Sequence, residues 1–395
     1  MAIEWKLISR EQWLCYGNEA PIVNPTTLRD DIPALDDVTY MNFGASGPSP
    51  RAVVEAATDA IEHHEYVSHG AEGPYTAAFD TYDEVRSTVA AFVGADPAEI
   101  ALTQSTTDGI NRIACALDWN PGDVVVRTDL EHPAGILPWQ RLERTSGVEV
   151  RVVEHDGRGR IDRERFAEAV DGARLVCLSA LTWNYGTRLP VRDLVDIAHD
   201  AGAFVLVDAV QTPGQMPMDV RKWGADAVAG AGHKWLLGLW GAGFLYVDEA
   251  VAERLSPRTI GYRSVVEPTA EQFEFLPGAT RFEVGTINPA PHVALGAAIE
   301  LAEEIGIGRI EDRIAALAAR FVDGVPDDRL VSPSTPESGL VTIDVDDPEG
   351  TVEQLGEEGI VVRSLAYPEA IRASIHAVNT EAEVDAVLAA LERSW

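Results

Sequence analysis

The candidate nucleophile of this chain is a lysine that lies among glycines and aromatic residues. Only three lysines occur, at positions 6, 222 and 234. Lys234 belongs to the sequence Gly-Ala-Gly-His-Lys-Trp at 230–235, whose glycines let the backbone approach a ligand closely. A lysine that is desolvated against aromatic groups loses its proton and attacks an aldehyde carbon. Lys6 falls in the terminal stretch and Lys222 in an Arg-Lys-Trp run typical of a surface helix or turn, so Lys234 is the candidate.

A carboxylate, Asp208, directly follows the apolar run at 204–207, and Gln211 comes three residues later. At the end of a strand, such a carboxylate can pair with a protonated ring nitrogen and let the ring withdraw electrons from a bound carbanion. The alternative is an aspartate that only caps the following turn.

Two further motifs suit a flat ring that carries a phosphate. The run Ser-Thr-Thr-Asp-Gly at 105–109 opens a predicted helix, so hydroxyls and free backbone amides gather where anions bind. Ordinary helix capping is the alternative for this run. His132 follows the strand-like run at 124–127 and can stack on a flat cofactor, although a lone loop histidine is usually exposed polar surface.

All four features follow strands of one predicted sheet. From about residue 85 to 250, short apolar strands alternate with amphipathic helices, which predicts a doubly wound, mostly parallel α/β sheet with helices on both faces. Ligands of such sheets bind beyond the carboxyl ends of the strands. Together the four features fit pyridoxal 5′-phosphate held as a Schiff base on Lys234. The predicted strands are 99–103, 124–127, 149–153, 175–178, 204–207, 227–229 and 243–247.

The second part of the chain predicts a smaller α+β domain. Helical patterns run from 292 to 304 and from 310 to 322, a strand-like run covers 339–345, and a last helical pattern covers 380–392. We therefore expect an N-terminal arm at 1–38 that is extended because of Pro21, Pro25 and Pro33 and packs near the small domain. A large cofactor-binding domain at 39–288 and a small C-terminal domain at 289–395 follow it.

The composition narrows the class of protein and its partners. The 395 residues carry a formal charge of -33, which repels nucleic acid and anionic lipid. Arginine carries nearly all of the positive charge, and this composition resembles that of salt-adapted proteins. The three cysteines, Cys15, Cys115 and Cys177, lie far apart, so neither a disulfide framework nor a metal site is indicated. We expect a cytoplasmic protein, since no apolar run suits a membrane span or a signal peptide.

The order and spacing of the motifs resemble the class V aminotransferase superfamily, most of all its cysteine desulfurase and selenocysteine lyase branch. The resemblance covers nearly the whole chain and implies the fold type I of pyridoxal-phosphate transferases. The segments that carry it are 42–46, 106–111, 131–132, 138–140, 208–211, 233–235, 281–286 and 372–374.

The resemblance also implies a role for each site residue. Lys234 would form the Schiff base and carry protons, Asp208 would bind the pyridine nitrogen, and His132 would stack on the ring. The further residues are Gln211 near the ring hydroxyl, Thr106, Thr107 and His233 on the phosphate, Arg372 on the substrate α-carboxylate, and Ala45 and Trp183 beside the substrate. Thr286 would reach the phosphate of a neighbouring subunit, which implies a homodimer. A surface ion pair is the alternative for Arg372.

Three departures from the family pattern bear on the reaction. The stretch 361–372 contains no cysteine, although desulfurases carry there the thiol that accepts sulfur. Ala231 replaces a serine that would contact the phosphate. Trp183 takes the place of a family asparagine and either narrows the pocket or packs in the interior.

The sequence therefore predicts a pyridoxal-phosphate enzyme that acts on a small amino acid by transamination or C–S lyase chemistry. An epimerase or racemase of the same fold is an alternative, because the fate of the carbanion decides the reaction. A nucleotide-binding protein is disfavoured, since GxGxxG and GxxxxGK[ST] are absent. A catalytically silent relative is disfavoured by the joint presence of Lys234, Asp208, His132 and Arg372.

Overall fold

The computed structural model describes residues 24–393. The first part of the expected arm, residues 1–23, lies outside the described residues, together with Lys6, Cys15 and Pro21.

Two short segments of the described part of the arm are helical rather than extended, which corrects the expectation for this part. Helix α2 (Pro25–Asp30) is followed by the short 3-10 helix η1 (Pro33–Leu35). Proline fits the first turn of a helix, where its missing N–H is not needed, so Pro25 and Pro33 begin these helices instead of extending the chain. Asn24 caps α2 by accepting hydrogen bonds from the amides of Thr26 and Thr27.

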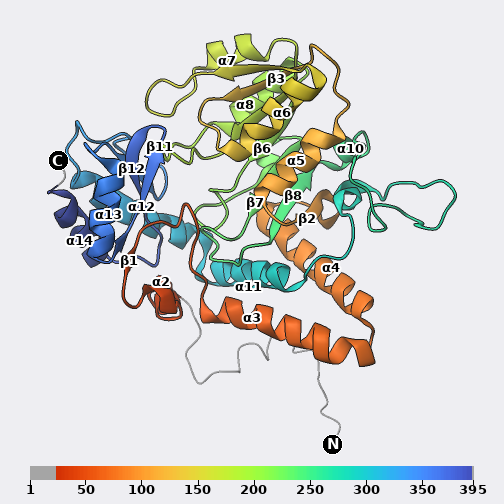
Figure 1. The fold of residues 1–395 in the computed structure, drawn as a ribbon, viewed down its shortest axis with the longest axis horizontal. Coiled ribbons are helices and arrows are strands. Elements are labelled where there is room, and N and C mark those ends of the chain that lie inside the picture. The colour runs from red at the N-terminus through yellow and green to blue at the C-terminus, as the bar shows by residue number, and fades with distance from the viewer. Residues whose placement is uncertain (1–23, 394–395) are drawn as a thin grey trace, which may run out of the picture.

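A seven-stranded sheet forms the centre of the larger part of the molecule (Figure 1). All seven predicted strands are present in it with slightly different ends. Strand β8 runs antiparallel to both of its neighbours, and the other pairs are parallel, so the carboxyl ends of the other six strands meet at one edge. In sheet order the strands are β2 (Ile100–Thr103), β8 (Gly243–Val247), β7 (Ala227–Ala231), β6 (Phe204–Asp208), β5 (Ala173–Ser179), β3 (Val124–Thr128) and β4 (Glu149–Val153).

Helices cover both faces of this sheet, because alternate strand residues feed two separate apolar cores. Val124 and Val126 join one core, while Val125 joins the other. The first core is completed by α4 (Pro74–Val93), α7 (Arg163–Val170), α8 (Val191–Asp200) and α11 (Ala290–Ile305), and the second by α5 (Thr106–Ala116), α6 (Leu137–Ser146) and α10 (Glu249–Ala252). Helix α3 (Arg51–Glu62) packs against α11 and belongs to the first core.

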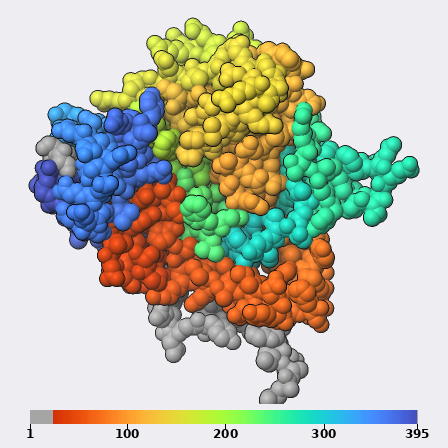
Figure 2. Space-filling view, in the orientation of Figure 1, coloured from red at the N-terminus to blue at the C-terminus, as the bar shows by residue number. Residues whose placement is uncertain are grey.

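A smaller antiparallel sheet lies beside the large one. Its order is β11 (Arg363–Ala366), β12 (Glu369–Ser374) and β9 (Leu340–Ile343). A separate apolar core joins it to α12 (Ile307–Asp323), α13 (Pro348–Glu357) and α14 (Glu381–Leu391). Figure 2 shows this C-terminal part in blue against the N-terminal segment in red.

The N-terminal segment connects the small sheet to the site edge of the large one. Strand β1 (Thr39–Tyr40) pairs in parallel with β10 (Ile360–Val361), and the amide of Ser374 donates to the carbonyl of Met41 at 2.7 Å. The following residues, including Gly44 and Ala45, thereby lie between the two sheets. No helix within residues 24–393 is long and apolar enough to cross a membrane.

Candidate active site

A pocket at the carboxyl edge of the large sheet collects the predicted site residues from seven segments of the chain. Every predicted residue lines it except Thr286, and Arg363 joins them although the sequence analysis did not single it out. The lining residues are Gly44, Ala45, Ser105, Thr106, Thr107, His132, Ala134, Trp183, Asp208, Val210, Gln211, His233, Lys234, Arg363 and Arg372.

Lys234 follows strand β7 and is buried at the floor of this pocket. Burial, helped by the positive charges of Arg372 and Arg363 and opposed by Asp208, lowers the pKa of its ammonium group to about 7. About half of the amine is therefore neutral near pH 7, as a nucleophile or base requires. In contrast, Lys222 is exposed on helix α9 (Val220–Trp223) and pairs with Asp219, which confirms the surface-helix interpretation.

Asp208 ends strand β6 and is buried beside Lys234. Burial raises the pKa of its carboxyl group, while the amide of Val210 at 2.9 Å and the charge of Lys234 lower it. The bond to Val210 resembles the turn cap named as the alternative. One carboxylate oxygen accepts that bond, which leaves the other for a cationic ring nitrogen.

Glu131 is a functional candidate that sequence reasoning passed over. Its buried carboxyl accepts hydrogen bonds from the hydroxyls of Thr128 and Ser179, each at 2.7 Å, and from the Ser179 amide at 3.1 Å. Burial raises the pKa of this carboxyl to about 7. Because Thr128 ends β3 and Ser179 ends β5, Glu131 fixes the start of the loop that carries His132.

His132 is a neutral ring in the pocket wall. Burial, followed by the charge of Lys234, lowers the pKa of its imidazole to about 4. Its Nδ1 accepts a hydrogen bond from the amide of Ala134 at 3.3 Å, and its ring meets that of Trp183 edge-on at 5.4 Å. A neutral ring without a charge to solvate is suited to cover a flat aromatic ligand.

The N-terminus of helix α5 supports both interpretations of the serine and threonine run. Ser105 caps the helix by accepting a hydrogen bond from the Asp108 amide at 3.1 Å. The buried hydroxyl of Thr106 has no hydrogen-bond partner among the described residues, so it is available to an anion at this helix end. Thr107, the next residue, is exposed. His233, the other residue expected at the phosphate, has a pKa that burial lowers to about 4.

Arg372 lies on strand β12 and is fully buried, so the surface ion-pair alternative is wrong. Its Nη1 donates to the carbonyl of Trp183 at 2.6 Å, while Nε and Nη2 have no partner within the described part of the chain. Burial and the charge of Arg363, which lies directly opposite in the β11–β12 pair, lower the pKa of Arg372 to about 9. Two adjacent guanidinium groups therefore favour an anionic ligand, and the free fork of Arg372 suits a carboxylate.

Trp183 lines the pocket rather than the interior, and it belongs to a tight turn at 182–187. The carbonyl of Thr182 accepts the Gly186 amide, and the Thr182 amide donates to Thr187, both at 3.0 Å. Thr342 of strand β9 donates to the carbonyl of Asn184 at 2.6 Å, so the turn also joins the large part to the small sheet.

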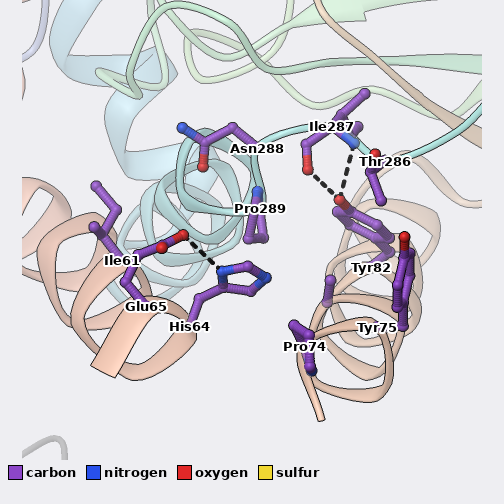
Figure 3. Close-up of a pocket in the computed structure, with 11 residues that line it drawn as sticks. Ile61, His64, Glu65, Pro74, Tyr75, Tyr82, Thr286, Ile287, Asn288 and Pro289 are labelled. Atoms are coloured by element: carbon purple, nitrogen blue, oxygen red, sulfur yellow. Dashed lines mark hydrogen bonds and ion pairs between the residues drawn. The ribbon is translucent and has the colours of Figure 1, made fainter. Parts of the chain in front are cut away.

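Gln211 and Thr286 lie differently from the other residues. Gln211 donates to the carbonyl of Gly44 at 2.9 Å and accepts from the indole of Trp235 at 2.7 Å, so its amide fastens the N-terminal segment to the pocket floor. Thr286 is exposed and lines a second cavity together with Tyr82 (Figure 3). The structure therefore does not bring Thr286 together with Lys234 of the same chain.

These residues fit pyridoxal 5′-phosphate together with an amino acid. The unpartnered hydroxyl of Thr106 suits a phosphate, the half-neutral Lys234 suits an aldehyde, and the unpartnered nitrogens of Arg372 suit an α-carboxylate. No group of three or more potential metal ligands occurs among residues 24–393.

Comparisons with known proteins agree with this arrangement. The family model of aminotransferase class-V matches residues 39–387. A probable cysteine desulfurase from Methanothermobacter thermautotrophicus is 36% identical, over 92% of this chain and 96% of that protein. The apo structure of a cysteine desulfurase from Thermococcus onnurineus gives a TM-score of 0.87 at 31% identity, covering 94% of this chain and 98% of that one.

Two solved structures of the cystine C–S lyase C-DES are also similar. A mutant with glycine covalently linked to the PLP cofactor gives a TM-score of 0.88 at 28% identity and covers 93% of this chain and 99% of that one. A complex with the product cysteine persulfide gives a TM-score of 0.86 at 28% identity and covers 92% of this chain and 99% of that one. The chain belongs to the class V aminotransferase family and its cysteine desulfurase branch, with the fold type I α/β architecture of a pyridoxal-phosphate-dependent enzyme.

Proposed function

We propose that the protein is a C–S lyase that eliminates the sulfur substituent from the β-carbon of a small sulfur-containing amino acid. The observation that carries this proposal is that neither the described pocket nor the segment leading to Arg372 contains a thiol. The stretch 361–372 runs from the end of β10 into the β11–β12 hairpin and contains no cysteine, and no cysteine lines the described pocket. The likeness to C-DES, a cystine C–S lyase, supports the same reaction class.

The two described cysteines are poor sulfur acceptors. Cys177 lies inside strand β5 and is fully buried, and burial raises the pKa of its thiol well above the usual range. Cys115 is a partly buried residue of helix α5. Since the thiolate is the nucleophilic form, neither of these two cysteines is suited to take sulfur from the substrate, which supports release of the sulfur with the product.

The residues of the pocket divide the elimination among them. Bound pyridoxal phosphate supplies the electron sink for a carbanion at the substrate Cα. Arg372 holds the α-carboxylate through Nε and Nη2, and neutral Lys234 removes the Cα proton. Asp208 keeps the ring nitrogen protonated, and His132 and Trp183 cover the reacting atoms. The electron pair left at Cα would form a Cα=Cβ bond while the Cβ–S bond breaks with its electrons on sulfur, which takes up a proton. Water would then hydrolyse the released enamine to pyruvate and ammonia.

The product from L-cysteine and L-cystine distinguishes the candidate reactions. With no keto acid added, we expect pyruvate and ammonia in equal amounts with the released sulfur product, and no product from Lys234→Ala. Cys177→Ala serves as the thiol control and should keep full activity. The lyase proposal would be contradicted if alanine were the main product and if its formation were lost in Cys15→Ala or Cys177→Ala. A single turnover that leaves the cofactor in its amine form would indicate a transaminase instead.

We further propose a homodimer in which Thr286 of each chain completes the cofactor site of the other. The support is its position: Thr286 is exposed and lines a different cavity from Lys234, although the family resemblance assigns it to a cofactor phosphate. The proposal fails if Thr286→Ala in one subunit leaves cofactor binding in the other subunit unchanged.

The remaining expectations concern the whole chain. We propose the domain division at residues 38 and 288, because the large sheet spans residues 100–247 and the small sheet 340–374. We also propose a cytoplasmic location and adaptation to high salt, and the support for both is the composition, with its charge of -33.

A further inference from the structure

The loop that carries Thr286 is exposed at its tip but held on both sides. Glu283 is buried before it, and Ile287 is half-buried after it. The loop borders a cavity of about 480 Å³ between the ends of helices α3 and α4 (Figure 3). Only residues 284–286 lie between the two fixed positions.

The hold on the far side comes from a single hydroxyl. The hydroxyl of Tyr82 donates to the carbonyl of Ile287 and accepts from the amide of the same residue at 3.2 Å (Figure 3). Both backbone polar groups of Ile287 are thus fixed by one side chain on helix α4. Because Ile287 directly follows Thr286, this pair of bonds limits the positions that the Thr286 side chain can take.

Helix α4 provides a rigid support for this hydroxyl. The Tyr82 side chain is buried, with 1% of its surface exposed, and the guanidinium of Arg263 lies over its ring at 4.9 Å. Arg263 also lies over Phe79 at 4.3 Å and pairs with Glu283 at 2.7 Å. Glu283 pairs in turn with Arg86 at 2.6 Å. One face of α4 therefore fixes both ends of the loop.

We propose that Tyr82 is a positioning residue for the cofactor phosphate of the neighbouring subunit. It acts through Thr286, whose loop it holds in one conformation, and it does not touch the reacting atoms. The inference rests on the shared-site dimer proposed above. A loop without this hold must lose conformational freedom when Thr286 binds the phosphate, which weakens cofactor binding.

Mixed dimers with two affinity tags test the inference. One subunit is wild type, and the other carries Lys234→Ala together with Tyr82→Phe, so only the wild-type Lys234 gives the visible absorbance of covalently held cofactor. Titration of the cofactor-free mixed dimer with pyridoxal phosphate gives the Kd of that one site. Loss of the hydroxyl should raise this Kd roughly 2- to 10-fold relative to a partner with Lys234→Ala alone.

Placing the two substitutions in different subunits separates an effect on the position of Thr286 from a general loss of stability. When Tyr82→Phe is placed in the subunit that keeps Lys234, the loop that it loosens faces the silent site, and the Kd should not change. Tyr82→Phe keeps the ring and its contact with Arg263, so the fold should be preserved. Tyr75→Phe is the matched control, because Tyr75 lines the same cavity and Figure 3 draws no hydrogen bond from it to the other residues there.

Thr286→Ala in the Lys234→Ala subunit distinguishes the two proposals. If it leaves the Kd unchanged, the shared-site dimer is wrong and the role of Tyr82 falls with it. If Thr286→Ala raises the Kd while Tyr82→Phe does not, the dimer stands and the inference on Tyr82 alone is overturned. An effect of Tyr82→Phe on the site of its own subunit would overturn it as well.

Discussion

Burial decides which single residues in the pocket and directly behind it change protonation near neutral pH. His132 and His233, with pKa values lowered to about 4, remain neutral there, and Arg372, at about 9, remains charged. Lys234 and Glu131, both at about 7, are the groups that titrate. They differ in their neighbours, since the two arginines act on the lysine and not on the glutamate.

Removal of a positive neighbour and removal of a negative neighbour should therefore shift the pKa of Lys234 in opposite directions. We expect the rate at which cofactor-free protein captures pyridoxal phosphate to rise with pH through about 7, as the neutral amine forms. Arg372→Gln removes a positive charge that lowers the lysine pKa, so the midpoint should move up. Asp208→Asn removes the negative charge that raises it, so the midpoint should move down.

Stopped-flow absorbance between pH 5 and about 9 measures both midpoints. Glu131→Gln is the control and should leave the midpoint in place if Lys234 is the titrating group. A midpoint that disappears in Glu131→Gln, or that moves in the same direction in the Arg372 and Asp208 variants, would contradict this assignment.

At the scale of helices and strands, the local sequence predicts the large sheet because buried parallel strands are continuous apolar runs. The motifs that directly follow these strands were found for the same reason. Long-range partners were not found: Arg363 reaches the pocket because the hairpin register places it opposite Arg372, Glu131 binds a residue 48 positions away, and Tyr82 binds Ile287 205 positions away. The periodic spacing of apolar residues along a helix or strand carries no information about such long-range pairs.

The turn at 182–187 offers a test of how one connection supports the site. Gly186 has a φ of +71°, and an added Cβ would lie 2.1 Å from the carbonyl oxygen of Leu340, whereas Gly202, with a φ of +80°, faces open space. We expect Gly202→Ala to cost about 1–2 kcal/mol of unfolding free energy through backbone strain alone. Gly186→Ala should cost about 2 kcal/mol more, because the turn must move off strand β9.

Urea unfolding in high salt measures this difference. Displacement of the turn also moves the carbonyl of Trp183 that accepts from Arg372, so Gly186→Ala should raise KM for the amino acid while Gly202→Ala leaves it unchanged. Equal unfolding free energies for the two variants would show that the turn adapts and that the contact with the small sheet is unimportant.

For the molecule as a whole, the acidic excess matters more than any single ion pair. The 64 acidic residues face only 31 lysines and arginines, and one-to-one pairs such as Arg320–Asp385 and Arg313–Glu381 lie on the surface. Exposed pairs of this kind contribute little each. The unpaired carboxylates repel one another over a Debye length, which falls from about 10 Å at 0.1 M salt to about 3 Å at 1 M.

Screening of this repulsion should make the folded state depend strongly on salt. We expect the Tm to rise by several degrees as KCl increases from 0.1 M to 1 M, with most of the gain at the lower concentrations, where the Debye length changes most. Sucrose at matched osmolality is the control, since it strengthens burial without screening charge. A Tm that is flat in KCl, or a rise that sucrose reproduces in full, would show that charge repulsion does not limit stability and would remove the support for salt adaptation.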